Sequence, residues 1–341
     1  MPVAAPGVSL GVMRFGYTLM TEQSGPRDLV RHAVDAERVG FDFEVSSDHY
    51  FPWLDAQGHS PNAWVTLGAV AQATERVELM TYVTCPILRY HPAVVAQQAA
   101  TLGALSGGRF LLNLGAGEAL NEHVAGQRWP AVGERHDMLE EAIEIIRSLL
   151  DGERLTFDGQ HFRVDSAILW DRPDEPVELG VAVSGTQSVS RFAPLVDHLV
   201  TTEPSADVVR QWGEVRDREG IEASSRVIGQ IPISWDADAD AALARAHQQF
   251  RWFGLGWKVN ADLPTTEAFD SASASVRPED VAAGITCGPD LDAIVEAASA
   301  YWEAGFTDLA IVQIGEEKQD AFLAEAARPL LEKLRVAAPR D

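Results

Sequence analysis

The chain is poor in cysteine and has no long apolar run. Cys85 and Cys287 lie far apart, with no C-x-x-C pair and no histidine cluster at ligand spacing, so the sequence indicates neither a disulfide framework nor a metal site. No stretch reaches the roughly 18 apolar residues of a membrane span. Residues 1–13 lack the basic start and long apolar core of a signal peptide. We therefore expect a soluble, cytoplasmic protein without a membrane partner.

Positive charge is also scarce. The chain has 27 basic and 51 acidic residues, a net charge of −24, and its three lysines are Lys258, Lys318 and Lys333. A field of this sign repels nucleic acid and anionic membranes. An acidic host proteome is a simpler explanation of the excess than an acidic binding patch, so we predict no nucleic-acid partner.

Apolar, strand-like segments alternate with helical periods along most of the chain. Three clear helical patterns span 27–40, 91–105 and 133–152. Eight strand candidates occupy 14–20, 41–47, 76–84, 109–117, 177–185, 197–202, 226–235 and 307–315. Continuous apolar strands alternating with helices indicate a parallel sheet covered by helices, and eight such units predict a closed (β/α)8 TIM barrel.

Two segments depart from this alternation. Residues 154–164 alternate around Asp158 and Gly159 as a β-hairpin does. The segment 236–290 is rich in Ala, Ser, Asp and Gly and contains Trp252 and Trp257, and we interpret it as an insertion near the top of the barrel. The prediction is one barrel domain over 1–341 with an insertion at about 236–290.

The candidate catalytic residues directly follow predicted strands. In a barrel, catalytic groups lie where strands end and the following loops begin. Asp48 and His49 follow the second strand, "TYVTCP" (81–86) ends the third, and "GAGEALNEH" (115–123) ends the fourth. We expect five side chains from this rim to converge: Asp48, His49, Trp53, Glu118 and Asn121.

A histidine, carboxylates and a tryptophan suit a reaction that moves a proton together with a hydride. Histidine titrates near neutral pH, a half-buried glutamate can have a raised pKa, and an indole face suits an electron-poor ring. No nucleophile elbow, Walker loop or Rossmann glycine motif precedes a helix. Each residue alone also has a structural explanation: His49 as a loop hydrogen-bond partner, Glu118 as a helix-start residue and Trp53 as packing.

Four motifs carry a family resemblance: "GYTLMTEQSGPRDLV", "SDHYFPW", "RYHPAVVAQQAATL" and "GAGEALNEHVAG". They resemble the bacterial luciferase-like superfamily, in particular its coenzyme F420-dependent glucose-6-phosphate dehydrogenase branch. The similarity covers most of the first 170 residues and is thin beyond them. It implies a barrel that binds the deazaflavin F420 at the carboxyl ends of its strands, with flavin mononucleotide (FMN) as the alternative cofactor.

The resemblance also implies roles for individual residues. His49 would be the base on the substrate hydroxyl, Asp48 its neighbour at the cofactor ring, Trp53 a stabiliser of the transition state, and Glu118 the acid at ring nitrogen one. Two further residues match active-site positions of the family: Glu22, which we place in the catalytic set, and Asn121, which we place in the cofactor set.

Other positions match the family's cofactor contacts. Tyr82 and Val83 occupy the place of a non-prolyl cis bulge behind the ring, and Cys85 follows closely. Three residues at a strand-to-helix turn match a phosphate loop: Ser184, Gly185 and Thr186. Free backbone N–H groups there would suit an anion, although a plain helix N-cap explains the turn equally well.

The second half departs from the sugar-phosphate dehydrogenases. Thr202 keeps a threonine of their phosphate site, but Ser205 stands at one lysine, residues 260–275 contain no lysine or arginine, and Gly284 falls at the arginine. Losing these cations would remove charge-assisted hydrogen bonds worth roughly 1.5 to 3 kcal/mol each. We therefore expect a small, non-phosphorylated substrate such as a secondary alcohol, a ketone, a free sugar or a lipid.

The sequence thus favours an F420-dependent oxidoreductase that transfers a hydride between a hydroxyl or carbonyl carbon and the deazaflavin. Two alternatives stay open: an FMN-dependent luciferase-like monooxygenase, and a non-catalytic cofactor-binding homologue. Members of the resembling family are commonly dimers, so we also expect a homodimer.

Overall fold

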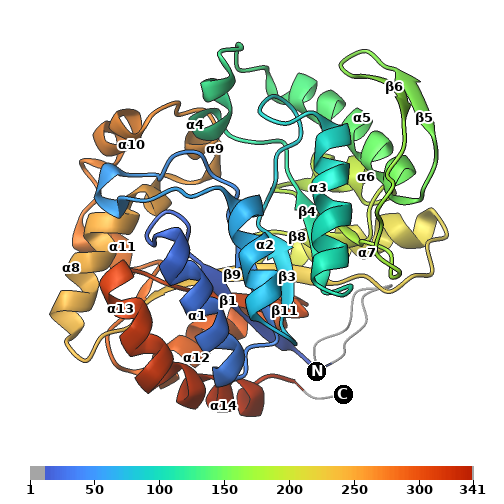
Figure 1. Cartoon of the computed structure of the whole chain (residues 1–341). Helices are drawn as coiled ribbons and strands as arrows, with labels where there is room; N and C mark the ends of the chain where they lie inside the picture. Colours follow the sequence, from blue (N-terminus) through green and yellow to red (C-terminus); the bar gives the residue numbers. More distant parts are fainter. Residues whose placement is uncertain (1–11, 340–341) are drawn as a thin grey trace.

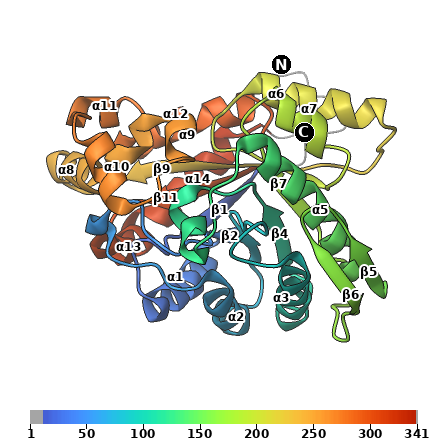
Figure 2. The same cartoon turned by 90° about the horizontal axis from the view of Figure 1, so that it is seen from above.

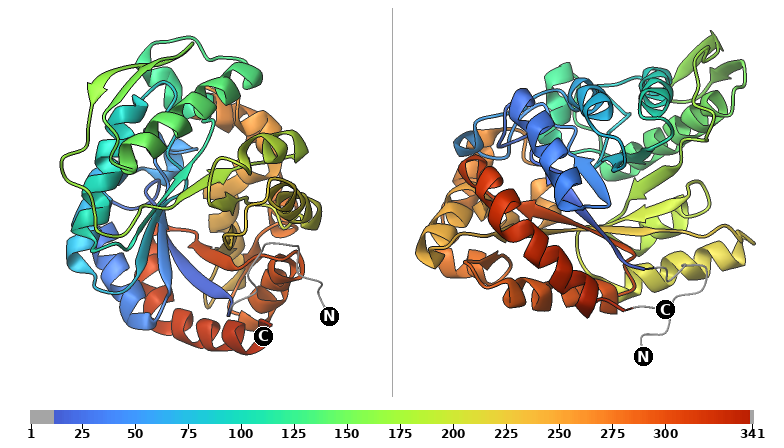
Figure 3. Two further views of the ribbon diagram at one scale, coloured as in Figure 1. Left: turned by 90° about the vertical axis from the view of Figure 1, so that its right-hand side faces the viewer. Right: turned by 60° about the horizontal axis from the view of Figure 1, so that its bottom comes forward.

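The computed structural model describes residues 12–339 and contains a closed barrel of eight parallel strands (Figures 1 and 3). Each strand pairs with the next, and β8 pairs with β9 to complete the ring. The strands are β1 (Arg14–Leu19), β2 (Phe43–Ser46), β3 (Glu78–Thr81), β4 (Phe110–Leu114), β7 (Leu179–Ala182), β8 (His198–Val200), β9 (Val227–Ser234) and β11 (Asp308–Gln313). The predicted (β/α)8 barrel is confirmed.

Helices surround the barrel, as Figure 2 shows from above. The main ones are α1 (Pro26–Val39), α2 (Ala63–Ala73), α3 (Pro92–Leu105), α5 (Val132–Leu150), α6 (Thr186–Phe192), α7 (Ala206–Arg218), α8 (Ala239–Phe250), α12 (Leu291–Glu303) and α14 (Ala327–Ala337). Among residues 12–339, none of these helices has the length and apolar character to cross a membrane. We expected no signal peptide in residues 1–13, and residues 1–11 of that segment lie outside the described residues.

Local sequence explains where α1 begins and ends. Pro26 fits the first turn, where a missing N–H is harmless, and Gly40 ends the helix with a φ of 113°, donating its N–H to the carbonyl of Ala36. Leu29 and Ala33 are buried against the sheet. This packing fixes the position at which the chain enters β2 and its functional loop.

The barrel has an inner core distinct from the layer between strands and helices. Its buried residues are Phe43, Val45, Met80, Leu111, Val200, Ile228 and Ala310. Gly16 leaves room for the Phe43 ring, which a Cβ would strike. Tyr82, Val83 and Ala182 pack on this core and form an apolar floor beneath the carboxyl ends of the strands.

The hairpin forms as β5 (Leu155–Asp158) and β6 (Arg163–Ala167), which pair antiparallel and extend from the barrel in Figure 2.

The segment 236–290 is folded into helices. It contains α8, η3 (Arg251–Leu255), α9 (Trp257–Asn260), α10 (Thr266–Ser273) and α11 (Pro278–Ala282), and ends in β10 (Thr286–Cys287), which pairs with β9. Its apolar side chains join Met20, Trp53, Leu54 and Leu120 in a separate core. The segment therefore packs against the loops that follow β1, β2 and β4.

Candidate active site

The centre of the site is His49, whose two ring nitrogens both face carboxylates. Its Nδ1 lies 3.0 Å from Oε1 of Glu22, outside hydrogen-bonding geometry, and its Nε2 lies 2.9 Å from Oε1 of Glu118. Glu22 follows β1, His49 follows β2 and Glu118 follows β4. The barrel thus brings together three residues that the sequence places far apart.

The two carboxylates control the protonation of His49. Burial disfavours the imidazolium, but the charges of Glu22 and Glu118 outweigh it and raise the pKa of His49 to about 9. An imidazolium donates from both nitrogens, whereas a neutral ring would turn a lone pair toward one carboxylate. His49 in this arrangement is a proton donor and becomes a base only after it has lost a proton.

The two partners of His49 differ in access. The side chain of Glu22 is 2% exposed and that of Glu118 is 12% exposed. The Nε2 side of His49, next to Glu118, is therefore the more open of the two.

Asp48 lies next to His49 in the chain, but its buried carboxylate is occupied by other groups. It accepts hydrogen bonds from the indole of Trp64 (3.2 Å), the hydroxyls of Thr84 (2.9 Å) and Tyr90 (3.2 Å), and it pairs with the guanidinium of Arg89 (3.2 Å). These contacts anchor the loop that carries His49 to the loop after β3.

Asn121 joins two other parts of the site. Its side-chain oxygen accepts from the backbone N–H groups of Tyr50 (2.7 Å) and Phe51 (3.1 Å), and its amide nitrogen donates to Oε1 of Glu118 (2.8 Å). Asn121 therefore holds Glu118 against the loop after β2, as expected if these loops share one site.

Sequence reasoning missed a buried ion pair behind Asp48. The backbone N–H of Arg89 donates to Oε2 of Glu122 at 2.9 Å, its side chain lies 3.5 Å from Oε1 of Glu122, and Nη2 donates to the Asp48 carbonyl. Both residues stand in motifs quoted above, "RYHPAVVAQQAATL" and "GAGEALNEHVAG". Arg89 is the one arginine, lysine or acidic residue of its motif, whereas Glu122 shares its motif with Glu118, so the available signal was Arg89 alone.

Trp53 packs on His49 in a T-shaped arrangement, with ring centroids 5.0 Å apart. The face of Trp53 stacks on Trp252, at a centroid distance of 4.1 Å and an angle of 13°, and Phe269 meets it edge-on at 5.1 Å. Trp252 comes from η3, so the segment 236–290 supplies a wall of the site. One face of Trp53 is thereby covered in this structure.

The floor of the site lies at the end of β3. The Tyr82–Val83 peptide bond is cis, at the position that the resemblance indicated. Val83 packs so closely on Gly115 that a Cβ there would lie 2.6 Å from its side chain, and Cys85 is buried beside Gly117, with a raised thiol pKa caused by burial. These residues form a close-packed support and leave no room for a side chain at Gly115.

The predicted phosphate loop stands at the start of α6. Ser184 and Thr186 are exposed, and Gly185 is the N-cap residue, whose carbonyl accepts from Ser188 Oγ at 2.8 Å. Within residues 12–339, no described interaction joins this loop to His49. Its assignment to the cofactor stays a prediction.

Of the positions that depart from the sugar-phosphate dehydrogenases, Ser205 has a structural role. Ser205 caps α7, its hydroxyl accepting from the N–H of Val208 at 3.4 Å. A Cβ at Gly284 would lie 3.8 Å from the ring of Phe253. Arg251, two residues before Phe253, pairs with Asp270. The structure therefore supplies no cation at Ser205 or Gly284.

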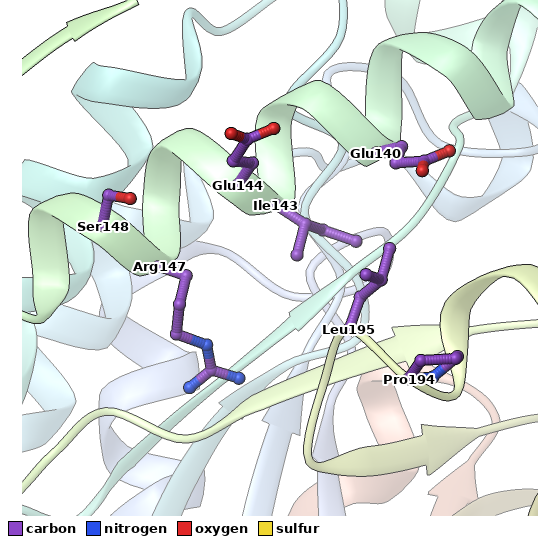
Figure 4. A pocket seen from close by; sticks show the side chains of 7 residues that line it. All are labelled: Glu140, Ile143, Glu144, Arg147, Ser148, Pro194 and Leu195. Carbon is purple, nitrogen blue, oxygen red and sulfur yellow. The ribbon is translucent and has the colours of Figure 1, made fainter. Parts of the chain in front are cut away.

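A hollow of about 350 Å³ lies elsewhere, between α5 and the connection from α6 to β8 (Figure 4). It is lined by Glu140, Ile143, Glu144, Arg147, Ser148, Pro194 and Leu195. Pro194 and Leu195 precede β8, so the hollow lies toward the amino ends of the strands, away from His49. Among residues 12–339, no cluster of His, Cys, Asp and Glu is suited to a metal ion.

Comparison with known proteins places this geometry in context. A model of the luciferase-like monooxygenase family matches residues 13–308. F420-dependent glucose-6-phosphate dehydrogenases from Nakamurella multipartita and Beutenbergia cavernae are 36% and 37% identical, over 95% of this chain and 97% and 98% of theirs.

Among solved structures, an F420-dependent secondary alcohol dehydrogenase in complex with an F420–acetone adduct is similar, with a TM-score of 0.86 and 28% identity over 94% of this chain and 99% of that one. The F420-dependent tetrahydromethanopterin reductase of Methanopyrus kandleri has a TM-score of 0.74 at 19% identity, over 94% of this chain and 97% of that one, a likeness of fold alone.

Proposed function

Because the chain belongs to the luciferase-like monooxygenase family, we propose that the site around His49 is the active site of a coenzyme F420-dependent oxidoreductase. The observation that carries the proposal is the imidazole of His49 held between Glu22 and Glu118 at the carboxyl ends of the strands. The names of the F420-dependent relatives and of the alcohol dehydrogenase structure support it.

The residues present fit a flat, redox-active ring. Tyr82, Val83 and Ala182 provide an apolar floor, and Gly115 keeps that floor free of a further side chain. When bound there, F420 would accept or supply the hydride. Asp48, Cys85 and Asn121 would hold the loops around the ring, and Ser184, Gly185 and Thr186 are proposed for its phosphate.

His49 is proposed to carry the proton of the reaction. As an imidazolium it would donate to the oxygen of a carbonyl substrate, and as a neutral ring it would accept the proton of an alcohol. The Nε2 side is assigned to the substrate because Glu118 is the more exposed of the two carboxylates. The T-shaped contact with Trp53 keeps the imidazole ring in position.

The proposed substrate is small and non-phosphorylated, with a hydroxyl or carbonyl carbon as the reacting centre. Ser205, which caps α7, and Gly284 support this choice, since neither supplies a cation. Glucose 6-phosphate, named in the relatives, is the rival substrate. FMN is the rival cofactor.

Tryptophan fluorescence tests the cofactor assignment. The purified protein is titrated with oxidised F420 and, separately, with FMN. Saturable quenching by F420 at micromolar concentration, with weaker or no binding of FMN, is the expected result. A preference for FMN would favour a monooxygenase, and no response to either cofactor would contradict the proposal. Binding without turnover of any alcohol, ketone or glucose 6-phosphate would favour a non-catalytic homologue.

We further propose that the protein is a homodimer that associates through α2 and α3, which lie side by side in Figure 1. Neither helix contains a charged residue, yet each has exposed apolar side chains: Val65, Ala69, Ala73, Val94, Ala104 and Leu105. Two chains of charge −24 repel each other, so an uncharged face is where a second copy could dock.

A hollow of about 380 Å³ between α1 and α2, bordered by Val65 and Ala69, continues this face. Analytical ultracentrifugation tests the proposed dimer interface: the double variant with Val65→Glu and Val94→Glu should be a monomer. Val336→Glu, which changes a similarly exposed valine on α14, should leave the dimer intact. A wild-type monomer, or an unchanged double variant, would contradict the assignment.

A further inference from the structure

The aromatic wall of the site contains a hydrogen-bond donor without an acceptor. Trp252 is 8% exposed, and its Nε1 is buried with no partner in the described residues. Other indoles of the chain do pair: that of Trp64 donates to Asp48 at 3.2 Å and that of Trp212 to Ser225 at 2.9 Å. A buried, unsatisfied donor costs about 1 to 3 kcal/mol, so Trp252 needs an explanation that core packing does not provide.

The position of Trp252 ties it to the reacting centre. Its ring stacks on Trp53 at 4.1 Å, and Trp53 in turn lies edge-on to His49 at 5.0 Å. Trp252 is therefore separated from the proposed proton carrier by a single aromatic ring.

A second unpaired group comes from the same segment. The side-chain oxygen of Asn260 is buried without a partner, and the residue is 4% exposed. The neighbouring carbonyl of Ala261 accepts from the N–H of Ala119 at 2.9 Å, which places Asn260 next to the chain that carries Glu118. The segment 251–261 thus holds one free donor in the ring that stacks on Trp53 and one free acceptor beside the chain that carries Glu118.

The surroundings of Trp252 are apolar. The core that contains Trp252 also includes Phe250, Phe269, Val281 and Ile285, with Phe253 and Leu255 packed against it. The nearby Arg251 is committed to Asp270. Lys258, in the same segment, is exposed, and no described interaction joins it to Trp252 or Asn260. An apolar wall with isolated polar groups suits a neutral molecule, because a dianion beside these two groups would lose its hydration without contacting a cation.

We propose that Trp252 and Asn260 are specificity-determining residues that bind the oxygen of a neutral, largely apolar alcohol or ketone. The indole N–H donates to the substrate oxygen in either oxidation state. The Asn260 side-chain oxygen accepts from the hydroxyl of a bound alcohol while His49 is an imidazolium that donates to the same oxygen. When His49 is neutral, the single hydroxyl proton turns from Asn260 to Nε2 and is transferred there. Asn260 has no proton to accept from a ketone, and so it recognises the alcohol alone. This inference rests on the proposed function, since it assigns the substrate class of the same site.

The direct test is the indole N–H resonance of Trp252 in ¹⁵N-labelled protein saturated with F420, assigned as the signal missing from Trp252→Phe. Cyclohexanol and cyclohexanone are the neutral probes, and glucose 6-phosphate is the charged one. Both neutral probes should move this signal downfield, as expected of an N–H that gains an acceptor, and glucose 6-phosphate should not. If neither neutral probe moves it, or only glucose 6-phosphate does, the inference is overturned.

Variants separate the two contacts. Trp252→Phe keeps an aromatic ring but removes the N–H, and it should weaken binding of both neutral probes about tenfold, which corresponds to about 1.4 kcal/mol. Asn260→Leu should weaken cyclohexanol alone. Trp302→Phe, a buried tryptophan on α12, is the matched control. Equal affinities in wild type and Trp252→Phe would overturn the role of Trp252.

Failure of this inference is distinguishable from failure of the proposed function. The affinity for F420 should be unchanged in Trp252→Phe and Asn260→Leu. If the wild type does not bind F420, the proposed function fails. If it binds F420 and reduces or oxidises a substrate while the Trp252 signal stays fixed with both neutral probes, only the substrate inference fails.

Discussion

His49 and Glu118 come from loops after different strands, yet Nε2 of one lies 2.9 Å from Oε1 of the other. With Glu22 3.0 Å from the other ring nitrogen, His49 is enclosed by negative charge on both sides. The arrangement favours the imidazolium, and this sets the direction in which the site can most readily transfer a proton at neutral pH.

The first prediction concerns the protonation of His49. Its pKa in the folded protein should be about 9, because the two carboxylates outweigh the effect of burial. NMR titration of the histidine Cε1–H resonances measures it, with the His49 signal assigned from His49→Gln. Glu118→Gln removes one charge and should lower the pKa, whereas Glu144→Gln on α5 should not change it. A wild-type pKa near the ordinary value of 6.5 would show that the carboxylates do not control His49.

The second prediction is the pH dependence of turnover. Reduction of a ketone by reduced F420 consumes a proton from His49, so kcat/KM should be constant below the pKa and fall as the pH rises through about 9. Oxidation of an alcohol needs the neutral ring and should rise over the same interval. Steady-state rates in both directions from pH 6 to 10 provide the measurement. Profiles with the same slope in both directions would exclude His49 as the proton carrier.

Much of the fold could be predicted because its determinants are local. The alternation of apolar strands with helices predicted the barrel. The ends of β2 and β4 indicated His49, Glu118 and Asn121 as candidate site residues. Helix α2 was missed because it is apolar on nearly every side and shows no helical period. The helices within 236–290 were missed because Ala alternates there with Asp, Ser and Gly, which masks the apolar helical period.

The interactions within the site were less predictable because they join distant segments. Nothing in the sequence indicates that Trp252 covers one face of Trp53, or that Asp48 is held by Trp64, Thr84 and Tyr90. Strand order fixes which loops meet. Which side chains contact each other depends on their packing, and this cannot be predicted from the positions at which the strands end.

The third prediction concerns Glu44, a buried residue of β2 outside the site. Both of its carboxylate oxygens lack a partner, and burial raises its pKa well above 4.5. The folded state therefore binds a proton that the unfolded state releases, so stability falls as pH rises above 4.5, by about 1.4 kcal/mol per unit until the folded pKa is reached.

Glu44→Gln should consequently raise the free energy of unfolding at pH 7 and leave it nearly unchanged at pH 4. Urea denaturation at the two pH values measures the difference. Glu144→Gln, at an exposed position on α5, is the control and should have little effect at either pH. A gain that is equal at pH 4 and pH 7 would mean that ionisation of Glu44 is not its cause.

The fourth prediction separates positioning from chemistry at Asn121. Asn121→Ala removes the acceptor of the Tyr50 and Phe51 N–H groups and the donor to Glu118. We expect kcat to fall about 10- to 100-fold with the fold retained, because Glu118 and the loop after β2 lose their common support. Asn121→Asp keeps the acceptor and should preserve the loop, so its affinity for F420 should exceed that of Asn121→Ala. An equal loss of F420 affinity in Asn121→Asp and Asn121→Ala would contradict a role for Asn121 in holding Tyr50 and Phe51.

The last prediction concerns the ion pair behind the site. Arg89→Met would leave the carboxylates of Asp48 and Glu122 buried without their cation. Removing one partner of a buried pair typically costs about 3 to 5 kcal/mol, whereas an exposed pair is worth no more than about 1 kcal/mol. Arg218→Met, which breaks the exposed pair with Glu219, is the matched control.

Urea denaturation should show a large loss in the free energy of unfolding for Arg89→Met and little loss for Arg218→Met. Adding Glu122→Gln to Arg89→Met should recover part of that loss, because one uncompensated charge is removed. A double variant no more stable than Arg89→Met would indicate that lost packing, and not buried charge, accounts for the effect.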